Sequence, residues 1–146
     1  MLLVRFQDDL KAAQLARIEV KVSTLRLLLS EIKNAEIAKG SELEDQEIIS
    51  IIQREVKKRK EAAQGFRLGG REEGALKEEA ELAILQSYLP EQLSNEELTK
   101  IVDEVINELG ATSREDMGRV IGAVMAKVTG KAGGEVVSAL VKEKLS

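Results

Sequence analysis

A single proline, Pro90, stands in a chain dominated by the helix-forming residues Leu, Ala, Glu, Lys and Arg. Proline lacks a backbone N–H and disfavours helix at the residue before it, so long helices are permitted on both sides of one stop. Apolar residues recur at the spacing of an amphipathic helix, as in Val22, Leu25, Leu29 and Ile32. The sequence therefore predicts an all-α fold without strands.

Capping residues and glycines set the expected ends of seven helices. Gly40 ends the second helix, and Asp45 is the predicted N-cap of the third. No Gly or Pro separates the first helix from the second, so a single bent helix remains an alternative there. The expected ranges are about 2–16, 19–39, 46–68, 71–89, 95–109, 114–128 and 135–145.

The segment LPEQLSNEEL is the strongest boundary signal in the sequence. Ser94 and Glu97 have the spacing of a capping box, which opens a new helix soon after the proline. Ser113 and Asp116 have the same spacing and open another helix. We therefore expect a four-helix N-terminal domain over residues 1–92 and a small three-helix C-terminal domain over residues 93–146.

The 146 residues include no histidine and no cysteine, two side chains that often act as general base or nucleophile. No serine lies in a GxSxG motif. We therefore expect no catalytic residue and no cofactor. The acidic clusters within residues 72–81 are interpreted as a solvated helix face rather than as ligands for a hard cation, so no metal site is expected.

The formal net charge is −4, and no apolar run approaches the roughly 18 residues of a membrane span. Asp8 and Asp9 interrupt the N-terminal segment early, which argues against a signal peptide. These features predict a cytoplasmic protein. We expect neither a membrane nor DNA as a partner.

Five of the 11 glycines fall within GRVIGAVMAKVTGKAGG, the segment from Gly118 to Gly134. Neither a Walker loop nor GxGxxG fits this segment. Gly118 and Gly122 lie on one helix face. Gly130 is a predicted helix stop, and Gly133 with Gly134 allows a turn before the last helix. Two interpretations remain: the glycines serve packing and turns alone, which we favour, or they also admit a phosphate group.

Two sets of basic residues are candidate RNA contacts. The set near the glycines is Arg119, Lys127 and Lys131. The members of a secondary basic patch are Arg26, Lys33, Lys57, Arg59 and Lys60. The alternative is a solvated surface with intrahelical ion pairs such as Glu55–Arg59 and Lys57–Glu61, which we favour for the secondary patch.

Several segments together resemble the GatB/YqeY domain family. In the C-terminal half they are YLPEQLS, DMG, GAVM and KVTGKAGG, and in the N-terminal half LRLLLSEIKNAEI, ELEDQEII, KKRKEA and KEEAELAIL. The resemblance covers essentially the whole chain and is to the single-protein branch of the family. It implies an N-terminal helical domain and a three-helix C-terminal domain similar to the tail of the GatB component of the tRNA-dependent amidotransferase.

In that enzyme the tail helps to hold the tRNA body, whereas amide transfer occurs in other domains. The resemblance therefore implies a non-catalytic adaptor that contacts tRNA, or a tRNA-modifying or aminoacylation enzyme, through its C-terminal domain. One alternative is a protein-interaction module without an RNA role. A less favoured one is a component of a glutamine-dependent carbon–nitrogen ligase.

The chain departs from the family pattern within the glycine-rich segment. The family commonly has MPKVKGRADG where this chain has MAKVTGKAGG. Ala126, Thr129, Lys131 and Gly133 stand in place of proline, lysine, arginine and aspartate. The loop therefore has one basic residue fewer than the family pattern, which weakens the expectation of RNA contact there.

Overall fold

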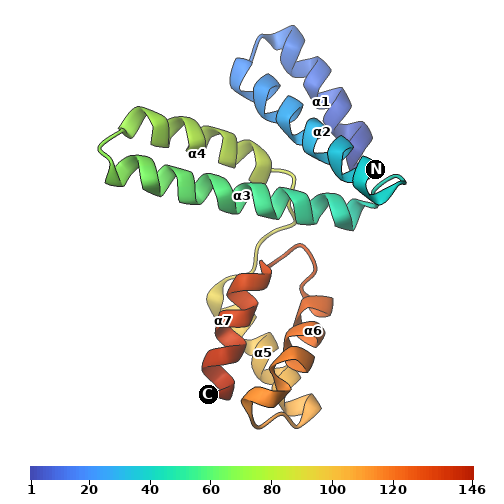
Figure 1. The fold of residues 1–146 in the computed structure, drawn as a ribbon, viewed down its shortest axis with the longest axis vertical. Helices are drawn as coiled ribbons and strands as arrows, with labels where there is room; N and C mark the ends of the chain where they lie inside the picture. Colours follow the sequence, from blue (N-terminus) through green and yellow to red (C-terminus); the bar gives the residue numbers. More distant parts are fainter. The chain divides into compact units, whose positions relative to one another are not determined.

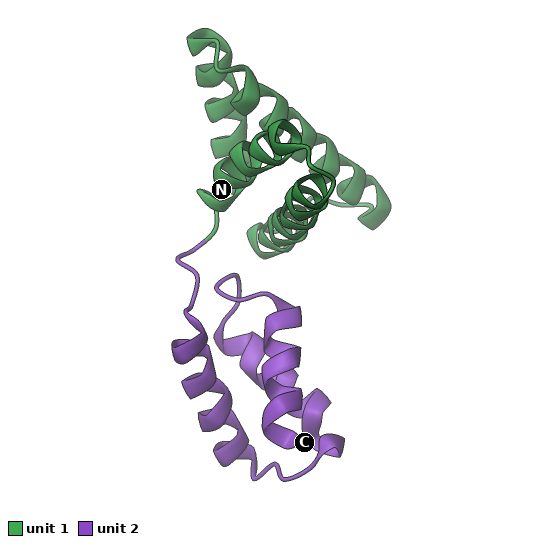
Figure 2. Ribbon diagram, turned by 90° about the vertical axis from the view of Figure 1, so that its left-hand side faces the viewer, with its two compact units in different colours: residues 1–89 green, residues 90–146 purple.

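The computed structural model describes residues 1–146 and contains seven α-helices, one short 3₁₀ helix and no strands, which confirms the all-α prediction. The chain divides into two compact units, Met1–Leu89 (unit 1) and Pro90–Ser146 (unit 2), as Figures 1 and 2 show. No helix in either unit combines the length and the apolar character needed to pass through a lipid bilayer.

The first two helices of unit 1, α1 (Leu2–Ala16) and α2 (Glu19–Lys39), lie side by side as a hairpin (Figure 1). The chain reverses at Arg17, whose backbone is left-handed with φ 56° and ψ 39°. The N–H of Ile18 donates to the carbonyl of Ala13 at 3.0 Å and closes the end of α1. The alternative of one bent helix is therefore excluded.

The next two helices, α3 (Asp45–Leu68) and α4 (Glu72–Gln86), form a second hairpin. α3 begins with a capping box between Glu44 and Glu47, so its N-cap is Glu44 and the prediction of Asp45 was wrong. The Asp45 carboxylate instead accepts the N–H of Leu2 at 3.2 Å. It therefore links the start of α3 to the start of α1.

The core of unit 1 forms where the two hairpins meet. Phe6 of α1 packs edge-on against Tyr88, with ring centroids 4.8 Å apart. The Tyr88 hydroxyl donates to Asp9 at 2.5 Å, and the Arg5 guanidinium lies 4.7 Å from the centre of the Tyr88 ring. Burial and the bond to Asp9 raise the pKa of Tyr88, so its hydroxyl remains a donor at neutral pH. The buried core residues are Phe6, Leu25, Leu28, Ile32, Ile48, Ile51, Ile52, Val56, Leu85 and Tyr88.

Gly74 lies where α4 passes the ring of Phe66 in α3. A Cβ atom at position 74 would come within 2.6 Å of Phe66 Cδ1, which is too close for a carbon–carbon contact. We expect Gly74→Ala to lower the free energy of unfolding by about 1 kcal/mol, because overpacking outweighs the added helix propensity. In a Phe66→Ala background it should instead stabilise the chain by about 1 kcal/mol. Urea unfolding of the variants measures both effects, and the same sign in both backgrounds would contradict the packing explanation.

Unit 2 packs α5 (Asn95–Leu109), α6 (Met117–Lys127) and α7 (Gly134–Leu145) around a valine-rich core. The Ser94 hydroxyl accepts the N–H of Glu97 at 3.2 Å, and the Glu97 carboxylate accepts the N–H of Ser94 at 3.0 Å, which confirms the first predicted capping box. A 3₁₀ helix, Arg114–Asp116, replaces the first turn of the predicted helix 114–128. The main core residues are Leu98, Val102, Val105, Val120, Val124, Val128, Val137 and Val141.

Candidate nucleic-acid interface

Two of the candidate glycines lie on the solvent-exposed side of α6. The helix buries Val120 and Val124 in the core of unit 2, which leaves Gly118 and Gly122 exposed. A Cβ atom added at either glycine would meet no other atom within 4 Å. No other part of unit 2 packs closely on these positions, so the packing interpretation does not hold for them within unit 2. This side of α6 is open to an external partner.

The turn after α6 requires glycine at one position. Gly130 is buried and has φ 76°, a left-handed conformation that glycine adopts at little cost. The prediction that it stops the helix was wrong in detail, because α6 already ends at Lys127 with Val128 as its C-cap and Gly130 lies in the turn that follows. Gly133 is extended, with φ −78°, and precedes α7, whose first residue is Gly134. Added Cβ atoms at Gly133 and Gly134 would meet nothing within 4 Å, so packing does not require glycine at either position.

Two of the segments that carry the family resemblance hydrogen-bond to each other. The N–H of Leu93 donates to the carbonyl of Lys131 at 2.9 Å, and the side-chain amide of Gln92 donates to the carbonyl of Gly130 at 2.8 Å. The same amide donates to the carbonyl of Pro90 at 2.7 Å. The glycine turn is thereby held against the first residues of unit 2, and the Lys131 side chain is left exposed. Sequence reasoning missed this contact, because no periodic pattern links positions 38 residues apart.

Arg119 is anchored beside the start of α6. Its guanidinium donates to Asp116 at 3.1 Å and to the carbonyl of Leu109 at 3.3 Å. The Asp116 carboxylate also accepts the N–H groups of Thr112 and Ser113, at 3.1 and 3.4 Å, which confirms the second predicted capping box. The bond from Thr112, supported by Ser113 and Arg119, lowers the pKa of Asp116, so this carboxylate is ionised at neutral pH. Arg119 retains further N–H groups that are not used by these contacts.

Lys127 and Lys131 differ in their contacts. Lys127 Nζ lies 3.3 Å from both carboxylate oxygens of Glu108, in a pair whose side chains are 43% and 62% exposed. An exposed pair of this kind contributes about 0–1 kcal/mol, so a phosphate can replace the carboxylate at small cost. Lys131 forms no ion pair and its side chain is exposed. Lys131, in the turn after α6, therefore carries a positive charge without an ion-pair partner. Lys127, the last residue of α6, can exchange its carboxylate partner for a phosphate.

The secondary basic patch is divided between α2 and α3. Arg26 and Lys33 are exposed on α2, and Lys60 is exposed on α3. Lys57 is exposed as well, but its Nζ lies 3.8 Å from Glu61 in the ion pair expected from their spacing. Only part of the patch therefore carries charge without an intrahelical partner.

The remaining member of the patch, Arg59, is engaged inside unit 1. Its side chain is 12% exposed and lies 3.2 Å from Glu55, as the spacing predicts, and 3.2 Å from Glu81 of α4. Arg59 therefore does not present its charge to solvent. Sequence reasoning missed the contact with Glu81, because the long-range packing of α3 on α4 brings the two residues together. No group of three or more acidic residues is arranged to hold a metal ion.

Comparison with known proteins assigns the chain to a family. A family model described as Yqey-like protein matches residues 3–145. A protein of Pyrenophora tritici-repentis named Altered inheritance of mitochondria protein 41, mitochondrial, is 31% identical over 90% of this chain and 74% of its own length. Proteins of the same name from Eremothecium gossypii and Vanderwaltozyma polyspora are 34% and 35% identical over 75% and 70% of this chain, which spans 62% and 57% of their lengths. The chain therefore belongs to the YqeY-like protein family.

Proposed function

We propose that the chain is a non-catalytic helical adaptor that binds tRNA through unit 2. The observation that carries this proposal is the open side of α6, where nothing packs on Gly118 and Gly122. Positions without side chains let a phosphate backbone approach a helix closely, and the nearby basic residues supply attraction. The family resemblance also supports the proposal. The C-terminal segments of this chain resemble the tail of the GatB component, and in that enzyme the tail helps to hold the tRNA body.

The proposed recognition depends on shape and phosphate contacts rather than on base stacking. All three aromatic residues of the chain, Phe6, Phe66 and Tyr88, belong to unit 1, so unit 2 offers no ring on which a base can stack. Arg119, Lys127 and the turn at Lys131 are the groups in unit 2 that we assign to phosphate. Binding through a few such contacts is weak and sensitive to salt.

A filter-binding titration with tRNA at low and at physiological salt tests the proposal. We expect binding that weakens as salt rises, with a slope of log K against log salt of about −2 to −3, because three basic side chains contact phosphate. Heparin, a polyanion without RNA shape, serves as the competitor. Absence of tRNA binding at low salt, or binding of heparin as tight as that of tRNA, would contradict the proposal.

Gly122→Ala is expected to change the stability of the chain and its affinity for tRNA in opposite directions. The added methyl group meets no neighbouring atom, so the gain in helix propensity should raise the free energy of unfolding by about 0.8–1 kcal/mol. The same methyl group keeps a phosphate backbone away from the helix, so tRNA binding should weaken. Urea unfolding followed by circular dichroism and filter binding measure the two effects.

Gly65→Ala is the matched control for this substitution. Gly65 is exposed on α3 of unit 1, and a Cβ atom there also meets nothing within 4 Å. We expect a similar gain in stability and unchanged tRNA binding. Equal tRNA affinity for Gly122→Ala, Gly65→Ala and the unchanged chain would show that the open side of α6 is not the contact surface.

A further inference from the structure

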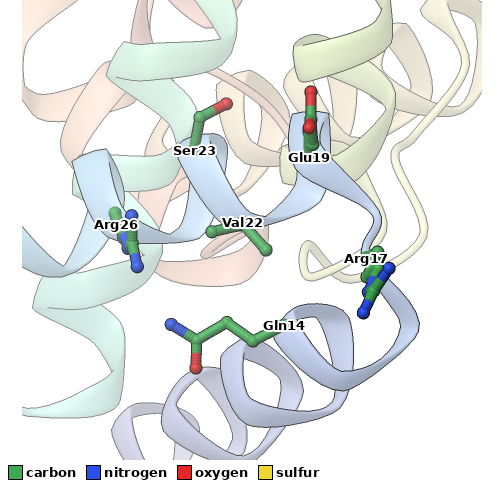
Figure 3. Close-up of a pocket in the computed structure, with 6 residues that line it drawn as sticks. All are labelled: Gln14, Arg17, Glu19, Val22, Ser23 and Arg26. Carbon is green, nitrogen blue, oxygen red and sulfur yellow. The ribbon is translucent and has the colours of Figure 1, made fainter.

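An open notch of about 550 Å³ lies between the end of α1 and the first half of α2 (Figure 3). Its volume falls within the range of about 300–1,000 Å³ that is typical of small-molecule sites. It belongs entirely to unit 1 and shares no residue with the interface proposed above for unit 2. The lining residues are Gln14, Arg17, Glu19, Val22, Ser23 and Arg26.

The backbone of Arg17 is unusual for this chain. Every other residue with positive φ is a glycine, whereas Arg17 adopts φ 56° with a full side chain. The left-handed conformation has a higher energy for a residue with a Cβ atom than for glycine. Backbone strain of this kind is concentrated at functional sites. Glycine would close α1 with less strain, so the presence of arginine points to a role for its guanidinium in the notch.

The two arginines of the notch have charges that no carboxylate neutralises. Arg59 and Arg67 of the same unit each contact two glutamates, whereas Arg17 and Arg26 form no ion pair. Figure 3 shows the Gln14 side chain reaching between the helices toward Arg26, with Arg17 at the corner where the chain turns.

The remaining polar groups of the notch are directed elsewhere. In Figure 3 the side chains of Glu19 and Ser23 point away from α1, while Val22 points toward it. The Ser23 hydroxyl donates to the carbonyl of Val20 at 3.1 Å. The unpaired guanidinium groups of Arg17 and Arg26 therefore lie toward the two ends of the notch, with the Gln14 amide and the Val22 side chain between them (Figure 3).

We propose that this notch binds a phosphate group, as a monoester or a diester, through Arg17 and Arg26 with Gln14 as a further donor. A guanidinium group presents several N–H donors in a planar fork that matches phosphate oxygens, and it stays charged at all physiological pH values. Val22 and the aliphatic parts of the arginines contact the organic part of the ligand. The phosphate belongs to a free nucleotide or to an RNA strand, and this assignment does not depend on RNA binding by unit 2.

Amide NMR titrations of the full chain at low salt test the proposal. The three probes are AMP, which carries a phosphate monoester; the dinucleotide ApA, which carries only a phosphodiester; and adenosine, which carries no phosphate. We expect AMP, ApA or both to shift the signals of Gln14, Arg17 and Val22, and adenosine to leave them unchanged. Shifts with AMP alone identify a terminal phosphate, and shifts with ApA identify an RNA backbone. No shift with either, or equal shifts with adenosine, would overturn the proposal.

Arg17→Gly tests the role of the guanidinium without disturbing the turn. Glycine readily adopts the left-handed conformation, so the melting temperature should be equal to or above that of the unchanged chain. The affinity for the probe that binds should fall at least tenfold. Arg54→Ala removes an exposed arginine from α3 and should change this affinity by less than twofold. Unchanged affinity in a folded Arg17→Gly variant would overturn the assignment.

Discussion

Arg59→Met is expected to lower the free energy of unfolding of unit 1 by about 3 kcal/mol. The Arg59 side chain is 12% exposed and stands between Glu55 at 14% and Glu81 at 9%, with 3.2 Å to each. Removal of the guanidinium leaves the Glu81 carboxylate buried without a counter-charge, which is a costly state for an ion in a protein interior. Glu55 is affected less, because Lys58 lies 3.4 Å away.

The contact between Arg59 and Glu81 is electrostatic rather than a well-formed hydrogen bond. Arg59 Nε is 3.2 Å from Glu81 Oε2, but this nitrogen is buried and has no hydrogen-bond partner, because its N–H is not aligned with the carboxylate. We therefore expect the double variant Arg59→Met with Glu81→Leu to recover most of the lost stability, since it removes both buried charges.

Urea unfolding followed by the fluorescence of Tyr88 measures these effects in unit 1 alone, because Tyr88 is the only tyrosine and the chain has no tryptophan. Arg54→Met, on the exposed side of the same helix, is the control and should change the free energy of unfolding by less than about 0.5 kcal/mol. A loss below about 1 kcal/mol in Arg59→Met would show that the ion cluster behaves as an exposed pair.

The second large effect is expected for tRNA binding. Lys127→Glu combined with Lys131→Glu should lower the affinity for tRNA at low salt by about 30-fold and make the salt slope less steep by about 2, because two phosphate contacts become repulsions. The new carboxylate at position 127 would also face Glu108, the present partner of Lys127, so circular dichroism must confirm that unit 2 remains folded. Filter binding at several salt concentrations gives both the affinity and the slope.

A charge-matched control distinguishes a local contact from the effect of net charge. Lys11→Glu combined with Lys77→Glu changes the net charge by the same amount, at exposed positions of α1 and α4 in unit 1. Both double variants are compared at physiological salt, where exposed charges are screened beyond about 8 Å. There we expect the control to lower the affinity by less than threefold and the Lys127→Glu, Lys131→Glu variant to lower it by more. Equal losses in the two double variants would assign the effect to net charge and contradict a contact at the glycine turn.

Local signals in the sequence were sufficient to predict most of the fold. Gly40 ends α2 in a left-handed conformation and Ser94 caps α5, as predicted, because each of these roles depends on a few neighbouring residues. The end of α1 carried no such signal, since Arg17 occupies a position where glycine is usual. The start of α3 was misplaced by one residue, because both Glu44 and Asp45 offer an acceptor and only the pairing with Glu47 decides between them.

Contacts between residues that are distant in the sequence could not be predicted, either within unit 1 or at the candidate site in unit 2. The spacing of Glu55 and Arg59 predicted their ion pair, but the contact with Glu81 follows from helix packing that no local pattern encodes. The same holds for the bond between Gln92 and Gly130. The four-residue spacing of Gly118 and Gly122 predicted a shared face, whereas only the structure shows that nothing else in unit 2 covers it.

Amide NMR of the full chain during titration with tRNA at low salt is the most direct test of RNA binding by unit 2. We expect signal changes to be concentrated at Gly118, Gly122 and residues 127–134, and to reverse when the salt concentration is raised. Absence of any change at low salt, or changes confined to residues 1–89, would contradict the proposed function.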